Sequence, residues 1–102
     1  MRQVLLRIPA DHPCVEGHFP GNPIVPGAVL LEEVLAMIER ELGRPATAWT
    51  VVVARFSRAV RPGEPLQLNF DANDAGGVRF ECSLGEQSVL SGRAHPTRGE
   101  PN

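Results

Sequence analysis

The chain has 102 residues, of which 42% are hydrophobic and 22% charged. This length excludes a barrel enzyme, a doubly wound dinucleotide-binding fold and a two-lobed architecture. The composition is that of a globular domain and not of a disordered chain. The ten basic residues are all arginine, and twelve acidic residues give a net charge of -2. This balance does not favour nucleic-acid binding, and the absence of lysine excludes Schiff-base chemistry.

Nothing in the sequence predicts export or membrane insertion. No segment approaches the roughly 18 consecutive apolar residues of a membrane span. The first apolar run is interrupted at Arg7 and Pro9, which makes it too short for a signal peptide. Cys14 and Cys82 are too few for a disulfide framework. We therefore expect a cytoplasmic protein with two reduced thiols and no contact with a membrane.

The first two predicted elements are a strand from Gln3 to Ile8 and an ordered loop after it. Between Pro9 and Pro26 the chain has five prolines and two glycines, which interrupt regular structure. The same stretch carries hydrophobic residues that favour burial. An ordered loop of this length in a small domain is usually functional.

A single long helix is predicted from Pro26 to Leu42. Proline suits the start of a helix, and Gly43 suits its end. One broad side of this helix is apolar, and such a side must be covered by a sheet. The apolar side comprises Leu30, Leu31, Val34, Leu35, Met37, Ile38 and Leu42.

Four strands are predicted after the helix. The first, Trp49–Phe56, contains three consecutive valines, a run typical of a strand that is buried on both faces. The segments 66–72 and 78–84 alternate apolar and polar residues, and a last strand spans 87–94. Residues 73–77 and 85–86 have turn chemistry.

These elements predict an α+β domain in which an antiparallel sheet of about five strands wraps around one long central helix. We expect residues 1–95 to form this single domain and residues 96–102 to form a frayed, flexible tail. Trp49 is expected in the core or in an interface, and His95 is expected next to the tail.

The residues that carry chemistry gather where the loop meets the helix, in the run GHFPGNPIVPGAVLLEEV from Gly17 to Val34. Pro26 has no amide hydrogen, so the Gly27 N–H is one of the first free donors of the helix and a natural seat for an oxyanion. Glu32 lies little more than one turn further on, among small apolar residues that would partly desolvate its carboxylate. The His18 imidazole can serve as a base near neutral pH.

Each of these residues also has an ordinary structural explanation. His18 alone could be a loop histidine that is hydrogen-bonded to backbone, and Glu32 alone could be a solvated helix charge. A segment of seven residues contains four side chains that could act as metal ligands: His12, Cys14, Glu16 and His18. No second cluster in the sequence completes a metal site. No catalytic pairing is visible for Cys14 as a nucleophile.

Taken together, the run GHFPGNPIVPG and the glutamate five residues after its last glycine resemble the signature of the hotdog-fold 3-hydroxyacyl-acyl-carrier-protein dehydratases. In that family a histidine begins an HFPG motif, and an acidic residue lies fourteen positions later in the central helix. His18 and Glu32 are fourteen positions apart. The segment ARFSRAVRPGEPLQLNF, from Ala54 to Phe70, resembles the family's strand that enters an RPG(D/E) turn.

The resemblance covers residues 2–94 and implies the hotdog fold. Family members commonly carry a further N-terminal segment before the part that aligns with Met1. We therefore expect a compact member in which the mouth of the substrate tunnel is open or is completed by a partner.

The resemblance implies a lyase that eliminates water from a 3-hydroxyacyl thioester to give the trans-2-enoyl thioester. His18 would remove the proton alpha to the thioester carbonyl, Glu32 would assist departure of the 3-hydroxyl as water, and the Gly27 N–H would hold the thioester oxygen. In the family these groups meet across a dimer interface. The residues that would shape the substrate pocket and the acyl tunnel are Phe19, Pro20, Val29 and Leu30. Strain or a cis peptide bond is expected within residues 18–20.

The resemblance also implies a substrate carried on the phosphopantetheine of an acyl carrier protein, with no metal and no other cofactor. Arg55, Arg58 and Arg61 lie between Gly43 and Gly63, where the chain has no acidic residue. They are either solvated strand charges or a positive patch for this acidic partner. We expect a homodimer with active sites shared between chains, or a hexamer or heterodimer.

Two other functions stay open from the sequence. A hotdog thioesterase would need a carboxylate placed to activate water at the carbonyl, and the HFPG loop does not have that pattern. A non-catalytic acyl-binding subunit of a heterodimeric dehydratase is disfavoured by the presence of both His18 and Glu32.

Overall fold

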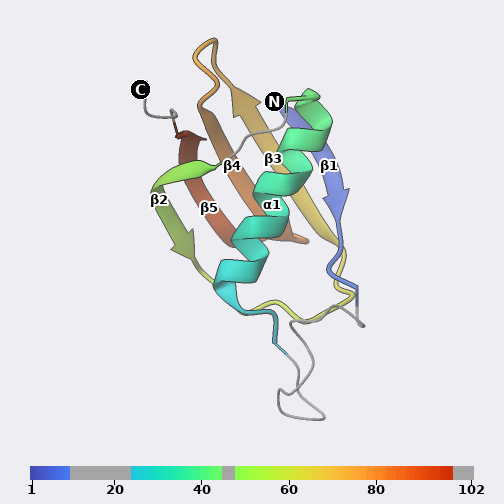
Figure 1. The fold of residues 1–102 in the computed structure, drawn as a ribbon. Helices are drawn as coiled ribbons and strands as arrows, with labels where there is room; N and C mark the ends of the chain where they lie inside the picture. The colour runs from blue at the N-terminus through green and yellow to red at the C-terminus, as the bar shows by residue number, and fades with distance from the viewer. Residues whose placement is uncertain (10–23, 45–47, 98–102) are drawn as a thin grey trace.

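Five strands and one helix make up the part of the chain that the structure, a computed structural model, describes: residues 1–9, 24–44 and 48–97. In chain order the elements are β1 (Arg2–Leu6), α1 (Gly27–Leu42), β2 (Trp49–Phe56), β3 (Leu66–Ala72), β4 (Val78–Leu84) and β5 (Gln87–Pro96) (Figure 1). The strands form one sheet in the order β1-β3-β4-β5-β2. Every neighbouring pair is antiparallel.

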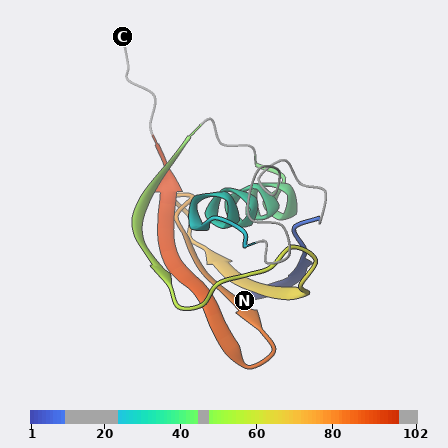
Figure 2. The same cartoon turned by 90° about the horizontal axis from the view of Figure 1, so that it is seen from below.

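The sheet curves around α1, which lies against its concave face (Figure 2). This arrangement confirms the α+β prediction of an antiparallel five-stranded sheet around a single helix. Within residues 1–9, 24–44 and 48–97, no helix has the length and apolar character needed to cross a membrane.

The bounds of α1 follow from the residues at its two ends. Pro26 is the N-cap and lends no side-chain hydrogen bond to the helix start. At the other end Gly43 adopts φ 63°, a left-handed conformation that glycine accepts without steric cost. The N–H of Gly43 donates to the carbonyl oxygen of Arg40, and the N–H of Arg44 donates to that of Glu39. These two bonds close the helix with a Schellman motif.

The core lies between α1 and the inner face of the sheet. The predicted apolar side of the helix is the buried one, with four of its residues inside the core: Leu30, Val34, Leu35 and Ile38. The alternating strands contribute their apolar faces, including Leu66, Leu68 and Phe70 from β3 and Val78, Phe80 and Cys82 from β4. The period-two pattern of both strands is therefore confirmed.

The predicted burial of β2 on both faces is wrong for this chain. β2 is an edge strand that pairs only with β5 among the described strands. The exposed fraction is 38% for Val51, 55% for Val52 and 49% for Phe56. The register of β2 against β5 also shifts between Val51 and Val53, which marks a β-bulge at the edge of the sheet. The apolar run of β2 therefore lies on a surface that the other described residues leave partly exposed.

Two strand ends differ from their predicted positions. β1 ends at Leu6, and Ile8 beyond it is buried, with its carbonyl oxygen accepting a 2.7 Å hydrogen bond from the N–H of Gly63. β5 continues to Pro96, and the N–H of Thr97 donates to the carbonyl oxygen of Ala48. The predicted tail, 96–102, is thus bonded to the sheet at its first two residues, and 98–102 lie outside the described residues.

Candidate active site

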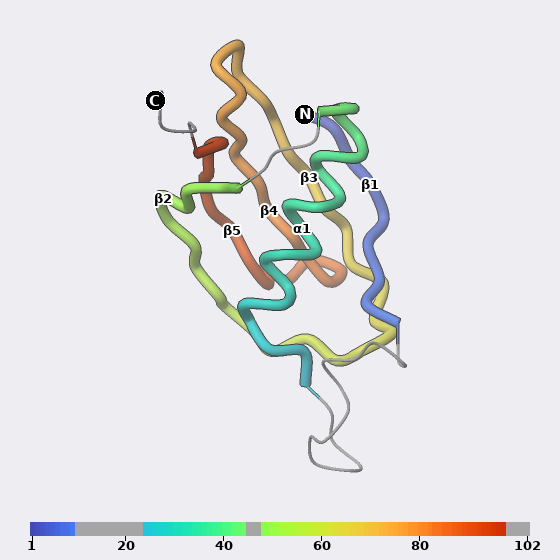
Figure 3. Tube along the Cα trace, in the orientation of Figure 1, coloured from blue at the N-terminus to red at the C-terminus, as the bar shows by residue number. Residues whose placement is uncertain are grey.

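The start of α1 is fixed by contacts from distant parts of the chain. The N–H of Val25 donates to the carbonyl oxygen of Val60 at 2.8 Å, and both residues are buried. A turn follows at 61–64, where the carboxylate oxygen Oε1 of Glu64 accepts from the N–H of Arg61 at 2.7 Å. The loop after β2 therefore runs beside the helix start (Figure 3).

Gly27 is the first residue of α1. The carbonyl oxygen of Pro26 accepts from the N–H groups of Val29 and Leu30, both at 3.0 Å. No hydrogen bond from the Gly27 N–H to another described residue is recorded. This N–H lies at the positive end of the helix dipole, a position that favours negative charge.

Phe56, at the end of β2, packs against Gly27. A Cβ atom built on Gly27 would lie 3.1 Å from Cε1 of Phe56 and 3.3 Å from both Cδ1 and Cζ. A side chain at position 27 would therefore press on the ring. Phe56 is not among the site residues predicted from the sequence. The one feature of the sequence that could have indicated it is its place as an apolar residue at the end of the predicted strand, in the ARFSRAVRPGE segment.

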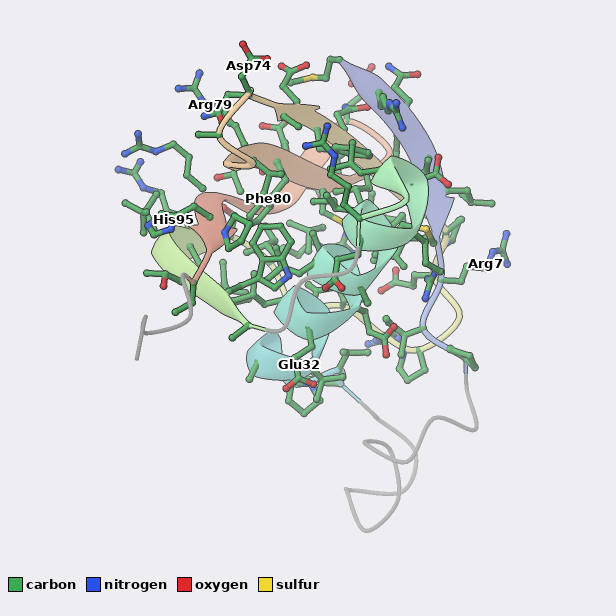
Figure 4. The ribbon with its side chains drawn as sticks, turned by 45° about the horizontal axis from the view of Figure 1, so that its top comes forward. Arg7, Glu32, Asp74, Arg79, Phe80 and His95 are labelled. Atoms are coloured by element: carbon green, nitrogen blue, oxygen red, sulfur yellow. The ribbon has the colours of Figure 1, made fainter. Side chains whose placement is uncertain are left out.

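Glu32 is exposed on the face of α1 that points away from the sheet (Figure 4). No hydrogen bond or ion pair joins it to another described residue. The partial desolvation predicted from its small neighbours is wrong for the chain by itself, because Ala28 is also exposed and Ala36 only half-buried. Residues one helical turn apart do not cover the carboxylate, and no second element among the described residues lies above it.

Several predicted site residues lie outside the described residues. They are His12, Cys14, Glu16, His18, Phe19 and Pro20, so the structure gives no distance from His18 to Glu32. The strain or cis peptide bond expected within 18–20 lies there as well. Of the two predicted tunnel residues that are described, Leu30 belongs to the core and Val29 is half-buried against it. Their lining of a tunnel stays a prediction.

The other candidate groups lie away from Glu32. His95, the histidine among the described residues, is exposed in β5 opposite Thr50, and Figure 4 shows it well apart from Glu32. Burial raises the pKa of the Cys82 thiol from 9.0 to about 11, so this group is a thiol and not a nucleophilic thiolate at neutral pH. Trp49 donates from Nε1 to Oε2 of Glu39 at 2.9 Å and packs against the core.

The three arginines proposed as a patch divide into two places. Arg58 and Arg61 line a depression of about 400 Å³ together with Ile24, Ala59 and Glu64, beside the entry to α1. Nη1 of Arg58 also donates to Oε1 of Gln87 at 2.9 Å. Arg55 instead lines a different depression of about 410 Å³, with Arg79 and Arg93. The structure thus brings together Arg58 and Arg61 but not Arg55.

Comparison with known proteins identifies the relatives of this chain. The FabZ 3-hydroxyacyl-acyl-carrier-protein dehydratase of Chloroflexus aggregans is 41% identical over 68 residues, which are 60% of this chain and 47% of the relative. The chain spans about half the length of that curated relative. Among solved structures, the dehydratase heterocomplex ApeI:P from Xenorhabdus doucetiae has a TM-score of 0.74 at 20% identity, covering 94% of this chain and 86% of that one.

The same fold also occurs in a thioesterase. The fluoroacetyl-CoA thioesterase FlK has a TM-score of 0.63 at 11% identity, covering 93% of this chain and 82% of that one. Likeness at this identity establishes the hotdog fold and does not distinguish the reactions that the fold supports. The family is given by the sequence, because residues 2–93 match the profile of the ApeI-like proteins, described as ApeI dehydratase. The chain therefore belongs to the ApeI-like dehydratase family.

Proposed function

We propose that this protein eliminates water from a 3-hydroxyacyl thioester to give the trans-2-enoyl thioester. The observation that carries the proposal is the placement, on the first two turns of α1, of a carboxylate at Glu32 and of the Gly27 N–H, which has no acceptor among the described residues. Five helical residues separate the two groups by about 7.5 Å along the axis. Both groups thus lie at the same end of the helix, where the carbonyl and the hydroxyl of a 3-hydroxyacyl group, whose carbon atoms are two bonds apart, would have to be bound together.

In the proposed reaction, the His18 imidazole accepts a proton from the carbon alpha to the thioester carbonyl. The electron pair of that C–H bond becomes the carbon–carbon double bond as the bond to the 3-hydroxyl breaks. Glu32, in its protonated form, donates the proton with which the hydroxyl leaves as water, directly or through a bound water, while His18 retains the proton from the alpha carbon. The Gly27 N–H stabilises the negative charge that develops on the thioester oxygen. These steps use no metal and no further cofactor.

The exposure of Glu32 supports a site that is shared between two chains. A side chain that faces bulk water cannot exclude water from the reacting atoms, so a second surface has to close over Glu32. The outer edge of β2, with Val52 and Phe56 exposed, has no partner among the described strands and is a strand edge of the kind on which sheets associate. We propose a homodimer in which His18 of one chain meets Glu32 of the other. A heterodimer with a homologous chain is the alternative, and a hexamer of such dimers is compatible with it.

The acyl group is proposed to arrive on the phosphopantetheine of an acyl carrier protein. The depression lined by Arg58 and Arg61 supports this, because two guanidinium groups beside the entry to α1 suit a phosphate and an acidic partner. Arg55 lies elsewhere and is left out of the proposed docking site.

The test uses two inactive variants, His18→Ala and Glu32→Gln, assayed alone and after mixing under conditions that exchange subunits. Each variant alone is expected to lose at least about 100-fold in the rate of enoyl formation, followed by absorbance. In a random mixture half of the dimers are mixed, and each mixed dimer has one intact site, so about a quarter of the wild-type rate should return.

Glu41→Gln serves as the control, since Glu41 is exposed on the same helix but near its other end. Full activity of both single variants would refute the dehydratase. Inactive variants with no recovery on mixing would refute the shared site. Release of free thiol without an enoyl product would favour the thioesterase.

A further inference from the structure

Phe56 is an exposed aromatic residue at the point where the end of β2 reaches the start of α1. Its exposed fraction is 49%, and its ring lies beside the position that a Cβ atom on Gly27 would occupy. It belongs neither to the buried core nor to the half-buried hydrophobic residues that pack against that core. Phe56 shares the exposed edge of β2 with Val52, but its contact with the first helical residue gives it a place beside the proposed site as well.

The backbone beneath Phe56 is held on both sides. Phe56 stands opposite Leu90 in the β2–β5 register, and the N–H of Ser57 donates to the carbonyl oxygen of Val89 at 2.8 Å. Four residues later, Val60 bonds to Val25 just before the helix. The ring therefore rests on a fixed base, at a position set by the same contacts that place the helix start.

We propose that Phe56 is a positioning residue of the dehydratase site, an inference that rests on the proposed function. Its ring covers one side of the Gly27 N–H and keeps water from that side. A donor in an apolar, water-poor surrounding binds a developing oxyanion more strongly than the same donor in water. A side chain at position 27 would crowd the ring, and the thioester would approach from the side opposite to it.

This role predicts an effect on the chemical step more than on substrate binding. The thioester oxygen gains most of its charge in the transition state, so loss of the apolar cover should lower kcat while KM changes little. If Phe56 instead formed only a side wall of the substrate pocket, its truncation would raise KM and change kcat little. The distinction can be measured because truncation of Phe56 removes few core contacts and should cost little stability.

The experiment compares Phe56→Ala and Phe56→Leu with Leu5→Ala. Leu5 is 62% exposed on β1, the other edge strand, so it controls for loss of an exposed apolar side chain. Kinetics are measured with a small 3-hydroxyacyl thioester, and light scattering follows the oligomeric state. We expect Phe56→Ala to lower kcat about 10- to 100-fold with KM within about threefold. Phe56→Leu should restore most of the rate, and Leu5→Ala should match the wild type.

Three results would overturn the inference: an unchanged kcat in Phe56→Ala, a raised KM at constant kcat, or a loss of rate that merely follows dissociation of the oligomer. A second readout keeps the inference separate from the proposed function. The Gly27 amide proton, followed by NMR, should exchange with water at least about threefold faster in Phe56→Ala. If the wild type turns over no 3-hydroxyacyl thioester, the dehydratase fails, and equal exchange rates would then refute the role of Phe56 as well.

Discussion

The N–H of Val25 donates a 2.8 Å hydrogen bond to the carbonyl oxygen of Val60, and this isolated bridge ties the residue two before α1 to the loop after β2. Both side chains are almost fully buried. Through this bridge the sheet, and not the preceding loop alone, decides where the Gly27 N–H lies. The position of the proposed oxyanion donor is therefore a property of the folded core.

The position of β2 in the sheet can be tested at Gly92 in β5, which lies opposite Ala54 of β2. A Cβ atom at position 92 would be 2.3 Å from the carbonyl oxygen of Val53 and 2.9 Å from Cζ of Phe80. Backbone cannot yield as a flexible side chain does, so Gly92→Ala should push β2 off the sheet. We expect a loss of about 2–4 kcal/mol in the free energy of unfolding, measured in urea.

Ser91→Ala is the matched control, because the change lies on the same strand and introduces no new atom. It should alter the free energy of unfolding by less than about 0.5 kcal/mol. If Gly92→Ala behaved like Ser91→Ala, the close approach of β2 and β5 at the bulge would be wrong.

The elements of the fold could be predicted from the sequence where a pattern is local. The helix between Pro26 and Gly43 and the alternating strands β3 and β4 follow from periodicity and turn residues, and their bounds are confirmed. The valine run of β2 predicted its strand but not its place in the sheet. An apolar face covered by this chain and one left for a partner have the same composition, so the pattern could not distinguish a central strand from an edge.

The candidate site could be predicted only in part, for a related reason. Gly27 was placed correctly at the helix start, because proline before it marks that start. The exposure of Glu32 depends on what lies above the helix, which neighbouring residues in the sequence do not determine. Phe56 reaches Gly27 from twenty-nine positions away, by the path of β2 along the sheet. No spacing in the sequence records that approach.

The proposed docking of a carrier protein predicts a selective defect in Arg61→Glu. Arg61 faces the depression beside α1, and reversing its charge should repel an acidic partner and a phosphate. The KM for a carrier-bound substrate should rise about 5- to 10-fold, while the KM for a small thioester without carrier stays the same. Steady-state kinetics with both substrates measure the difference.

Arg55→Glu is the control for total charge, since Arg55 lines a separate depression with Arg79 and Arg93. It makes the same change in net charge and should leave both KM values near those of the wild type. Equal effects of Arg61→Glu on the two substrates, or equal effects of the two variants, would place the docking surface elsewhere.

Cys82 gives the fold a predictable loss of stability at alkaline pH. Burial raises the pKa of its thiol from 9.0 to about 11 in the folded chain. Below pH 9 the thiol is protonated in both the folded and the unfolded states, so the buried thiol makes its full contribution to the free energy of unfolding. Between pH 9 and 11 the unfolded chain ionises and the folded chain does not, which favours unfolding. The difference in the free energy of unfolding between wild type and Cys82→Ala should therefore fall by about 2 kcal/mol from pH 8 to pH 11.

Urea unfolding of both proteins across this range measures that difference, and taking the difference removes the titration of every other group. The background for both is Cys14→Ser, so that a single thiol is present. A thiol reagent at pH 8 provides a second measurement, because Cys82 should react only as fast as the chain opens. A pH-independent difference together with rapid modification of the folded protein would mean that Cys82 is accessible and that β4 does not pack against α1 as described. A falling difference with slow modification requires the sheet and helix to enclose this position, the same packing that places Gly27 and Phe56 side by side.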